Sequence, residues 1–294
     1  MRIGLIGAGP WARQAAAPAL TAHPDIEFAG IWARRPDAAA QTAPEVPYVD
    51  DVDALIDSVD AVAFAVPPEV QFDLARRAAA AGRHVLLDKP IAGSAADAAT
   101  LVAAIDEAGV SSMVTLTRRF APETRAFLDA VRDTEVATVT ATWLSGALLG
   151  GEYAGSTWRQ EGGALLDVGP HVLDLAMEVL GPVESVAWAR RDDASDTWSL
   201  ALQHGSTAGV RTSLVTLSMR TPVRPSVLRV GASGPGGLVE LSDRTTPPDR
   251  CYAVLLDEFL ESVRTGTRHE CSAHRGLALQ SVIEQCRTLV ASGR

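Results

Sequence analysis

The sequence predicts an α/β protein of two domains. In residues 1–118, short apolar runs alternate with alanine-rich amphipathic segments, an order that builds a mainly parallel sheet with right-handed crossovers. A glycine-rich turn directly follows the first of these runs. After residue 183 the apolar runs follow one another through turn-rich linkers, which is typical of antiparallel strands. We therefore expect one domain over residues 1–118, and over residues 119–294 an α/β domain with an open, largely antiparallel sheet.

The elements of the first domain follow from its apolar runs. Each run is short and is followed by a segment with helical periodicity. In a sheet of this kind the ligand lies at the carboxyl ends of the strands. The expected strands are residues 3–6, 26–33, 61–66, 84–87 and 113–117.

The second domain is expected to begin with a loop and a helix. Residues 143–161 are rich in glycine and indicate a flexible loop. A helix should start at Gly169-Pro170 and stop at Gly181-Pro182, because proline is favoured at the first helical position and glycine after the last. Strands are then expected at residues 183–188, 198–204, 209–217 and 226–230, followed by helices at 252–264 and 277–289 that pack back on the first domain.

Composition restricts the partners of the chain. Its 294 residues carry a formal net charge of -10, so nucleic acid and anionic membranes would be repelled on average. The N-terminus enters a strand pattern without a leader, and no apolar run of about 18 residues is present. The three cysteines show no C-x-x-C spacing, so we expect neither a disulfide framework nor a metal site. These features predict a cytoplasmic protein with a small-molecule partner.

The glycine-rich turn has the pattern G-x-G-x-x-A. It lies between the first strand and an alanine-rich helix, which is the setting of the dinucleotide-binding turn of a Rossmann domain. One glycine permits the tight turn, the second lets a pyrophosphate approach the backbone, and the small third residue allows close helix packing. The helix N-terminus then faces the anion. The candidate cofactor residues of this turn are Gly7, Gly9, Pro10, Trp11 and Ala12.

Two further strand ends complete the expected cofactor site. Arg34 and Arg35 follow the second strand, where an NAD-specific site would place an acidic residue for the ribose 2′-hydroxyl. Guanidinium groups suit a 2′-phosphate, so we expect NADP, with NAD possible and a solvated loop paired with Asp37 as the alternative. Pro67 and Pro68 follow the third strand and are expected to line one side of the cofactor site.

A carboxylate and an ammonium group follow the fourth strand, in the sequence Asp88-Lys89-Pro90. The peptide bond before a proline has access to the cis form. Lys89 at the carboxyl end of a central strand is expected to face the ligand crevice, and an ordinary surface lysine is the alternative.

A second set of titratable residues lies in the C-terminal half of the sequence. Asp167, His171 and Asp174 have i, i+4 and i+7 spacing and share one polar side of the expected helix, if its geometry extends back to Asp167. A carboxylate beside an imidazole orients the ring and stabilises its cation, as general acid-base chemistry requires. The alternative is a histidine that only packs in the core or caps the helix.

Together these motifs resemble the Gfo/Idh/MocA oxidoreductase family, and the match covers nearly the whole chain. The resemblance implies that Lys89, Asp167 and His171 surround the reacting hydroxyl or carbonyl, with Asp88 near the nicotinamide ribose in place of the usual glutamate. Gln71 stands where many relatives have a histidine, and Thr117 replaces a frequent asparagine. The resemblance also implies sugar, polyol or cyclic alcohol substrates, and a homodimer or homotetramer formed through the C-terminal sheet.

Five further residues are candidates for contacting a polyhydroxylated substrate by hydrogen bonds and ring stacking. They lie around the predicted loop and after the fifth strand, and ordinary loop packing is the alternative for each. They are Thr117, Arg118, Tyr153, Trp158 and Arg159.

The sequence therefore predicts an enzyme that transfers a hydride between nicotinamide C4 and a carbinol or carbonyl carbon. His171 would move the proton, Asp167 would orient His171, and Lys89 would stabilise the reacting oxygen. Two alternatives stay open: a non-catalytic NAD(P)-binding sensor or regulator, and a redox-neutral enzyme that retains its nicotinamide.

Overall fold

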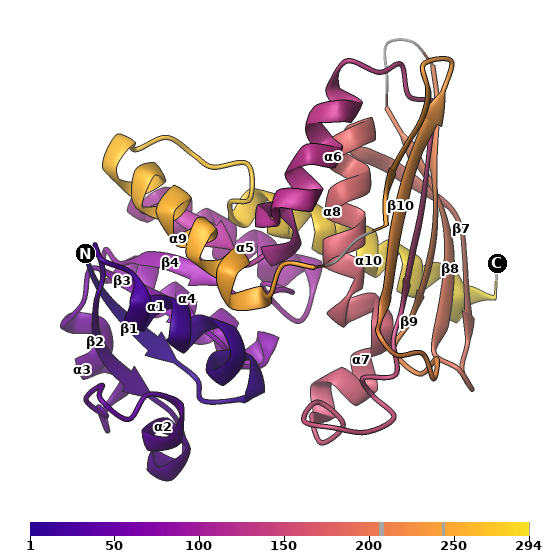
Figure 1. Ribbon diagram of the computed structural model, residues 1–294. Helices are drawn as coiled ribbons and strands as arrows, with labels where there is room; N and C mark the ends of the chain where they lie inside the picture. Colours follow the sequence, from indigo (N-terminus) through magenta and orange to yellow (C-terminus); the bar gives the residue numbers. More distant parts are fainter. Residues whose placement is uncertain (206–208, 243–244, 294) are drawn as a thin grey trace. The chain divides into compact units, whose positions relative to one another are not determined.

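The computed structural model describes residues 1–205, 209–242 and 245–293 (Figure 1). The chain divides into two compact units. Unit 1 comprises Met1–Phe120 and Pro247–Leu277, and unit 2 comprises Ala121–Thr246 and Ala278–Arg294. Each unit contains its own sheet. The domain boundary after residue 118 that the sequence suggested stays a prediction.

The sheet of unit 1 is parallel and has the strand order β2-β1-β3-β4-β5. Its central strands are apolar on both faces and buried, as expected when helices cover a parallel sheet on both sides. The predicted Rossmann sheet is therefore confirmed. Its strands are β1 (Arg2–Ile6), β2 (Glu27–Trp32), β3 (Ala61–Phe64), β4 (His84–Leu87) and β5 (Ser112–Val114).

The helices of unit 1 follow the strands in the alternating order predicted. After β1 the chain forms the π-helix η1 (Ala12–Ala16), which continues directly into α1 (Ala17–Ala22). Helix α9 (Pro248–Thr265) packs against η1, α1 and the 3-10 helix η2 (Thr117–Phe120). The remaining helices are α2 (Pro36–Thr42), α3 (Val52–Asp57), α4 (Pro68–Ala80), α5 (Ala95–Ala108) and the beginning of α10 (Ala273–Ser292), which passes into unit 2 at Ala278.

Unit 2 has a sheet with the order β11-β10-β6-β9-β8-β7. Its neighbouring strands are antiparallel except for the parallel pair β6 and β9, so the predicted open, largely antiparallel sheet is confirmed. Two of these strands, β6 and β11, were not predicted from the sequence. The six are β6 (Thr138–Leu144), β7 (Val183–Asp192), β8 (Thr197–His204), β9 (Arg211–Ser218), β10 (Val227–Gly234) and β11 (Gly237–Leu241).

The loop predicted over residues 143–161 is wrong at both ends. Trp143 lies in β6, where it is buried and pairs with Leu217 of β9, so the strand extends into the expected loop. Residues from Thr157 onward belong to α7 (Thr157–Asp167). Local glycine content favoured a loop, but pairing with distant strands fixes the first end and helical hydrogen bonds fix the second.

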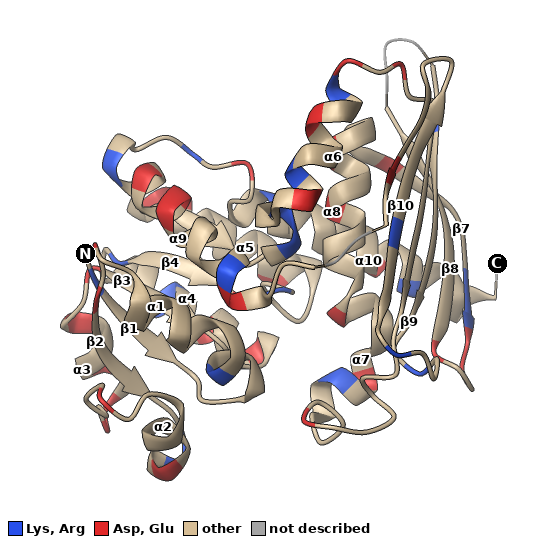
Figure 2. Ribbon diagram, viewed as in Figure 1, with Lys and Arg blue, Asp and Glu red and all other residues tan. Residues whose placement is uncertain are grey.

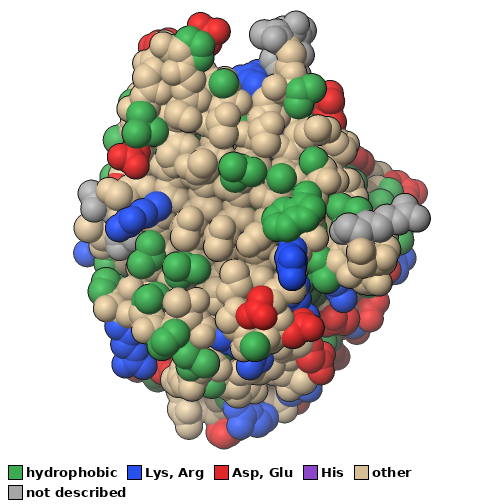
Figure 3. All heavy atoms as spheres, turned by 90° about the vertical axis from the view of Figure 1, so that its right-hand side faces the viewer, with side chains coloured by type: hydrophobic (Ala, Val, Ile, Leu, Met, Phe, Trp, Pro, Cys, Tyr) green, Lys and Arg blue, Asp and Glu red, His purple; other side chains and the backbone are tan. Residues whose placement is uncertain are grey.

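Three helices of unit 2 cover one face of its sheet (Figure 1). They are α6 (Pro122–Arg132), α7 and α8 (Gly169–Leu180), and α8 packs on β6 and β9. The predicted helix start is confirmed, since Pro170 occupies the first turn of α8. Gly181 ends α8 with φ 88°, a conformation suited to glycine. The opposite face of the sheet is open, and most of its strand residues carry no charge (Figures 2 and 3).

Candidate active site

The glycine-rich turn of unit 1 has the geometry of an anion-binding turn. Gly7 has φ 122°, and a Cβ atom there would collide with the carbonyl oxygen of Ala65. A Cβ atom built on Gly9 meets no atom within 4 Å, so the second glycine leaves its side of the turn open. Ala12 is fully buried and begins η1. The turn therefore gives an anion access to a helix N-terminus.

A cleft of about 440 Å³ lies beside this turn. Among the residues expected to bind cofactor, five line the cleft: Gly7, Gly9, Arg34, Arg35 and Pro67. Both arginines are exposed, and no described residue that lines the cleft is acidic. Pro10, Trp11, Ala12, Pro68, Asp88 and Lys89 are not among its lining residues.

Arg13 is a further basic residue at this turn, and it was not among the residues predicted from the sequence. Its Nη1 atom donates a hydrogen bond to the carbonyl oxygen of Ala8 at 3.1 Å, and Ala8 lines the cleft. Thr42 of α2 contacts the same oxygen at 3.5 Å. The signal in the sequence was only a cation one residue after the G-x-G-x-x-A pattern.

The turn that carries Asp88 and Lys89 is held by buried hydrogen bonds. Asp88 Oδ1 accepts from Thr115 Oγ1 at 3.0 Å and from the backbone nitrogen of Lys89 at 2.8 Å. Gln71, which is fully buried on α4, binds the backbone of the same turn. The peptide bond between Lys89 and Pro90 is cis. Asp88 and Lys89 are 6% and 9% exposed, so the turn is a fixed part of unit 1.

Tyr252 of α9 adds a buried hydroxyl near Asp88. Burial, together with the negative charge of Asp88, raises the pKa of the Tyr252 phenol far above its ordinary value of 10.0. The phenol therefore stays protonated throughout the physiological range.

The second candidate group lies in unit 2, at the junction of α7 and α8. Asp167 is the last residue of α7 and His171 lies in the first turn of α8. Val168 between the two helices keeps helical angles, φ -96° and ψ -20°, so Asp167 and His171 fall on the same side one turn apart. The ring of His171 stacks on Trp143 with 5.7 Å between centroids.

Arg159 holds the carboxylate of Asp167. Its Nε atom lies 3.2 Å from Asp167 Oδ2, and both side chains are largely buried. The guanidinium group also lies over two aromatic rings, 4.3 Å from the centroid of Trp158 and 4.9 Å from that of Tyr153. Three residues predicted to contact substrate, Tyr153, Trp158 and Arg159, thus meet in unit 2, where the guanidinium group of Arg159 joins the two rings to the carboxylate of Asp167.

Asp174 and the remaining substrate candidates are buried. Asp174 is fully buried on α8. Thr117 and Arg118 lie on η2, where Arg118 Nη2 contacts Cys251 Sγ of α9 at 3.4 Å. Lys89 belongs to unit 1, whereas Asp167 and His171 belong to unit 2, and their convergence on one oxygen stays a prediction.

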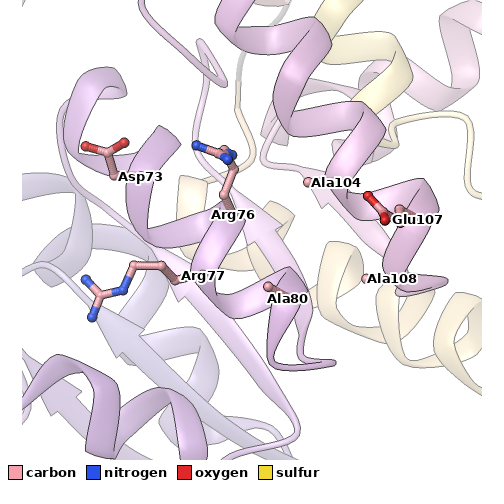
Figure 4. Close-up of a pocket in the computed structure, with 7 residues that line it drawn as sticks. All are labelled: Asp73, Arg76, Arg77, Ala80, Ala104, Glu107 and Ala108. Carbon is pink, nitrogen blue, oxygen red and sulfur yellow. The ribbon is translucent and has the colours of Figure 1, made fainter.

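A second hollow of unit 1, between α4 and α5, has a different character (Figure 4). Its lining carries two arginines, Arg76 and Arg77, and two carboxylates, Asp73 and Glu107, so its formal charges balance, and Arg77 is paired with Asp53 of α3. Within the described residues, no helix is long and apolar enough to cross a membrane, and no cluster of His, Cys, Asp or Glu could hold a metal ion.

The parallel sheet and the glycine-rich turn of unit 1 define a Rossmann domain. Residues 1–116 match the model of the Gfo/Idh/MocA family, described as an oxidoreductase family with an NAD-binding Rossmann fold. The N-terminal domain of the chain is therefore a member of this family, as the sequence motifs predicted.

Known proteins resemble the chain along its whole length. It is 28% identical over 313 residues to the dTDP-3,4-didehydro-2,6-dideoxy-alpha-D-glucose 3-reductase of Streptomyces antibioticus, covering 94% of this chain and 93% of that protein. It is 26% identical over 333 residues to the inositol 2-dehydrogenase of Rhizobium meliloti (strain 1021), covering 100% and 98%. Among solved structures, GenD2 from gentamicin A biosynthesis in complex with NAD has a TM-score of 0.88 and 21% identity, covering 100% of this chain and 95% of that one.

Proposed function

We propose that the chain transfers a hydride between a nicotinamide dinucleotide, with NADP preferred over NAD, and a carbinol or carbonyl carbon of a sugar, polyol or cyclic alcohol. The observation that carries the proposal is the arrangement in unit 2, where Arg159 holds Asp167 one helical turn before His171. The names of the two full-length relatives, a nucleotide-sugar reductase and an inositol dehydrogenase, support the substrate class.

The residues of unit 1 fit a dinucleotide. The open side of Gly9 leaves room for a pyrophosphate close to the backbone, and the N-terminus of η1 favours its negative charge. Arg34 and Arg35 are exposed guanidinium groups on the cleft and suit a 2′-phosphate, which accepts charge-assisted hydrogen bonds. When bound, the dinucleotide would supply or accept the hydride.

The chain itself would handle the proton. In the proposal His171 takes the proton from the substrate hydroxyl, or returns it in the reverse direction. Asp167 favours the charged form of that imidazole and fixes its orientation, and Arg159 keeps the carboxylate in place. Lys89 donates a hydrogen bond to the same oxygen and stabilises its negative charge in the transition state.

The substrate would be held by side chains near this group. Tyr153 and Trp158 offer ring faces and Arg159 offers hydrogen-bond donors, and in the proposal they contact the hydroxyl groups of the substrate. Thr117 and Arg118 are assigned the same role from unit 1. A cytoplasmic location is part of the proposal, because Cys251, Cys271 and Cys286 are buried thiols that are not joined in disulfides.

The first experiment is a substrate panel. Purified protein is mixed with NADPH or NADP, and separately with NADH or NAD, and with nucleotide sugars, aldoses, ketoses and inositols, while absorbance at 340 nm is followed. We expect turnover with at least one compound. Cofactor binding by calorimetry without turnover would favour a sensor instead. Product formation without net change in the cofactor would favour a redox-neutral enzyme.

Cofactor preference is tested by removing the arginines of the cleft. Arg34→Ala and Arg35→Ala should lower kcat/KM with NADPH while leaving that with NADH nearly unchanged, because only NADP carries the 2′-phosphate. Arg76→Ala is the matched control, since Arg76 is an arginine of the same unit that lines the other hollow. An unchanged ratio of the two kcat/KM values in both cleft variants would refute the preference for NADP.

Self-association through the sheet of unit 2 is also part of the proposal. The strand register places three exposed apolar side chains on the same face of this sheet, with Trp188 45%, Leu214 49% and Leu238 62% exposed. An apolar, weakly charged sheet face is suited to pairing with a second copy. Sedimentation velocity should give a dimer or tetramer, and Leu214→Glu should shift it to the monomer. A wild-type chain that sediments as a monomer would contradict this.

A further inference from the structure

The sharp bend inside α7 is shaped around a carboxylate from a distant part of unit 2. Gly163 has φ 62° and ψ -158°, a conformation essentially restricted to glycine. It separates a first helical segment, which carries Arg159, from residues 164–167, which end at Asp167. A Cβ atom on Gly163 would collide with the carboxylate oxygens of Asp196. The glycine is therefore required both by its own backbone angles and by the position of Asp196.

Asp196 is fixed in the turn between β7 and β8. It is 1% exposed and has φ 48°, a left-handed conformation that aspartate tolerates better than most residues. The backbone nitrogen of Ser195 donates to Asp192 Oδ2 at 3.0 Å, and Ser218 Oγ donates to the carbonyl oxygen of Ser195 at 2.8 Å. The turn thus presents the Asp196 side chain toward α7 in a defined position.

The buried charge of Asp196 is compensated on both of its oxygens. Oδ2 accepts a hydrogen bond from the backbone nitrogen of Ala164 at 2.6 Å. Oδ1 accepts from Trp198 Nε1 at 3.3 Å and lies 3.1 Å from Arg191 Nη2. A carboxylate buried without such partners would be strongly destabilising. The bond to Ala164 connects this cluster to the helix that bears Asp167.

That bond lies at the start of the second segment of α7. The first N–H groups of a helical segment have no acceptor within the segment, and a carboxylate placed there both accepts a hydrogen bond and interacts favourably with the helix dipole. Asp196 performs this capping role for α7 from the turn between β7 and β8. Asp167 follows Ala164 by three residues, and His171 follows Asp167 by four along nearly continuous helical backbone.

We propose that Asp196 is a positioning residue: its carboxylate fixes the start of residues 164–167 and thereby the placement of Asp167 and His171. The same bend allows Arg159, on the first segment, to reach Asp167 at 3.2 Å. The inference rests on the proposed function for what Asp167 and His171 do in the reaction. Asp196 acts through the helix and does not contact substrate or cofactor.

The test compares Asp196→Asn with Asp193→Asn. Asp193 lies in the same turn, its side chain is 88% exposed, and its Oδ1 lies 3.5 Å from Nε of the same Arg191. The control therefore removes a carboxylate charge and a contact with Arg191 without touching Ala164. Asp196→Glu is the third variant. Its extra methylene cannot fit against Gly163, so it should not restore the wild-type behaviour although the charge is kept.

Two readouts do not depend on turnover. In Asp196→Asn the backbone amide of Ala164 should exchange its hydrogen faster than in the wild type, because the charged acceptor is lost. The NMR signals of the His171 ring, assigned with His171→Gln, should also shift. Both should match the wild type in Asp193→Asn. Unchanged exchange and unchanged ring signals in Asp196→Asn, in a folded protein, would overturn the positioning role.

Kinetics gives the third readout. A misplacement of about 1 Å costs about 10²-fold in rate, so kcat should fall by up to that factor in Asp196→Asn while KM for the dinucleotide, bound by unit 1, stays unchanged. A fall in kcat that merely follows a loss of folded protein, measured by circular dichroism, would count against positioning. If the wild type turned over no substrate, the proposed function would fail, and the amide and ring signals would still decide the role of Asp196.

Should Asp196→Asn not fold, Gly163→Ala replaces it in the test. The methyl group would push the Asp196 carboxylate away from Ala164 and strain the backbone of residue 163, while the charges of Asp196 and Arg191 remain. The same changes in amide exchange and ring signals are then expected. Wild-type values in this variant would overturn the proposal.

Discussion

Gln71 binds Asp88 with both ends of its side-chain amide. Its Oε1 atom accepts from the backbone nitrogen of Asp88 at 2.7 Å, and its Nε2 atom donates to the carbonyl oxygen of the same residue at 2.8 Å. Nε2 also lies 3.1 Å from the carbonyl oxygen of Ile91. One fully buried side chain of α4 therefore holds the backbone on both sides of Lys89.

Replacing Gln71 should destabilise this turn. Gln71→Leu keeps the approximate volume but leaves a backbone N–H group and carbonyl oxygens without partners in a buried place, at a cost of about 1–3 kcal/mol for each group. Urea unfolding should show a clear loss of stability. Gln41→Leu, at an exposed position of α2, is the control and should change the free energy of unfolding by less than about 0.5 kcal/mol. Equal stability of the two variants would contradict the bracing role.

The two glycines of the first turn should respond differently to alanine. Gly7→Ala places a methyl group against the carbonyl oxygen of Ala65 at φ 122°, so we expect a lower melting temperature. Gly9→Ala meets no protein atom within 4 Å and should melt like the wild type, yet bind NADP more weakly, because the methyl group occupies the open side of the turn. Thermal melts and calorimetric titration check both. Wild-type affinity in Gly9→Ala would place the dinucleotide elsewhere.

Removing the imidazole should slow turnover without affecting cofactor binding. His171→Ala is expected to lower kcat by about 10²- to 10⁴-fold, the usual range for a lost general acid-base group. The dissociation constant of NADPH should not change, because the glycine turn and arginines belong to unit 1. His274→Ala, at a half-exposed histidine paired with Asp106, is the control. A kcat close to the wild type in His171→Ala would rule out the proton-transfer role.

Acid should destabilise unit 2 through His204. Burial lowers the pKa of His204 below its ordinary value of 6.5, and Arg211 lowers it further, although the Gly181 carbonyl acts in the opposite direction. The unfolded chain therefore binds a proton at higher pH than the folded one. The stability from neutral His204 is fully present above about pH 6.5 and is lost as the pH falls below that value.

The pH dependence is measured by urea unfolding at intervals between pH 8 and pH 5. His204→Gln, which cannot be protonated, should flatten the decline in the free energy of unfolding. A residual decline is expected, because burial also lowers the pKa of His84 in unit 1. An identical pH profile in the variant and the wild type would show that His204 does not contribute.

The sequence was most informative where the pattern is local. Strand-helix alternation and the Gly7 to Ala12 turn predicted the parallel sheet, because each strand and its turn are encoded in a few neighbouring residues. Pro170 likewise predicted the start of α8. Strand β6 was missed, since its identity depends on pairing with β9 and β10, which lie far along the chain.

The side-chain partners of the candidate site could not be predicted. No pattern of neighbouring residues indicates that Gln71 binds the backbone around Lys89. None indicates that Arg159 forms a hydrogen bond with Asp167, on the other side of the bend at Gly163. Tyr153, Trp158 and Arg159 were expected in a loop, yet the arginine is 8% exposed and lies over both rings. Such contacts depend on the direction of side chains after the elements have packed.

By itself, the sequence determined the strands and helices of unit 1, the glycine turn and the one-turn spacing of Asp167 and His171. These features depend on backbone preferences and periodicity, which act over a few residues. The tertiary structure decided which buried groups hold the reactive ones: Gln71 for the turn of Lys89, and Asp196 for the bend at Gly163. A buried polar atom must find its partner within hydrogen-bond distance, and folding alone sets which distant residue supplies it.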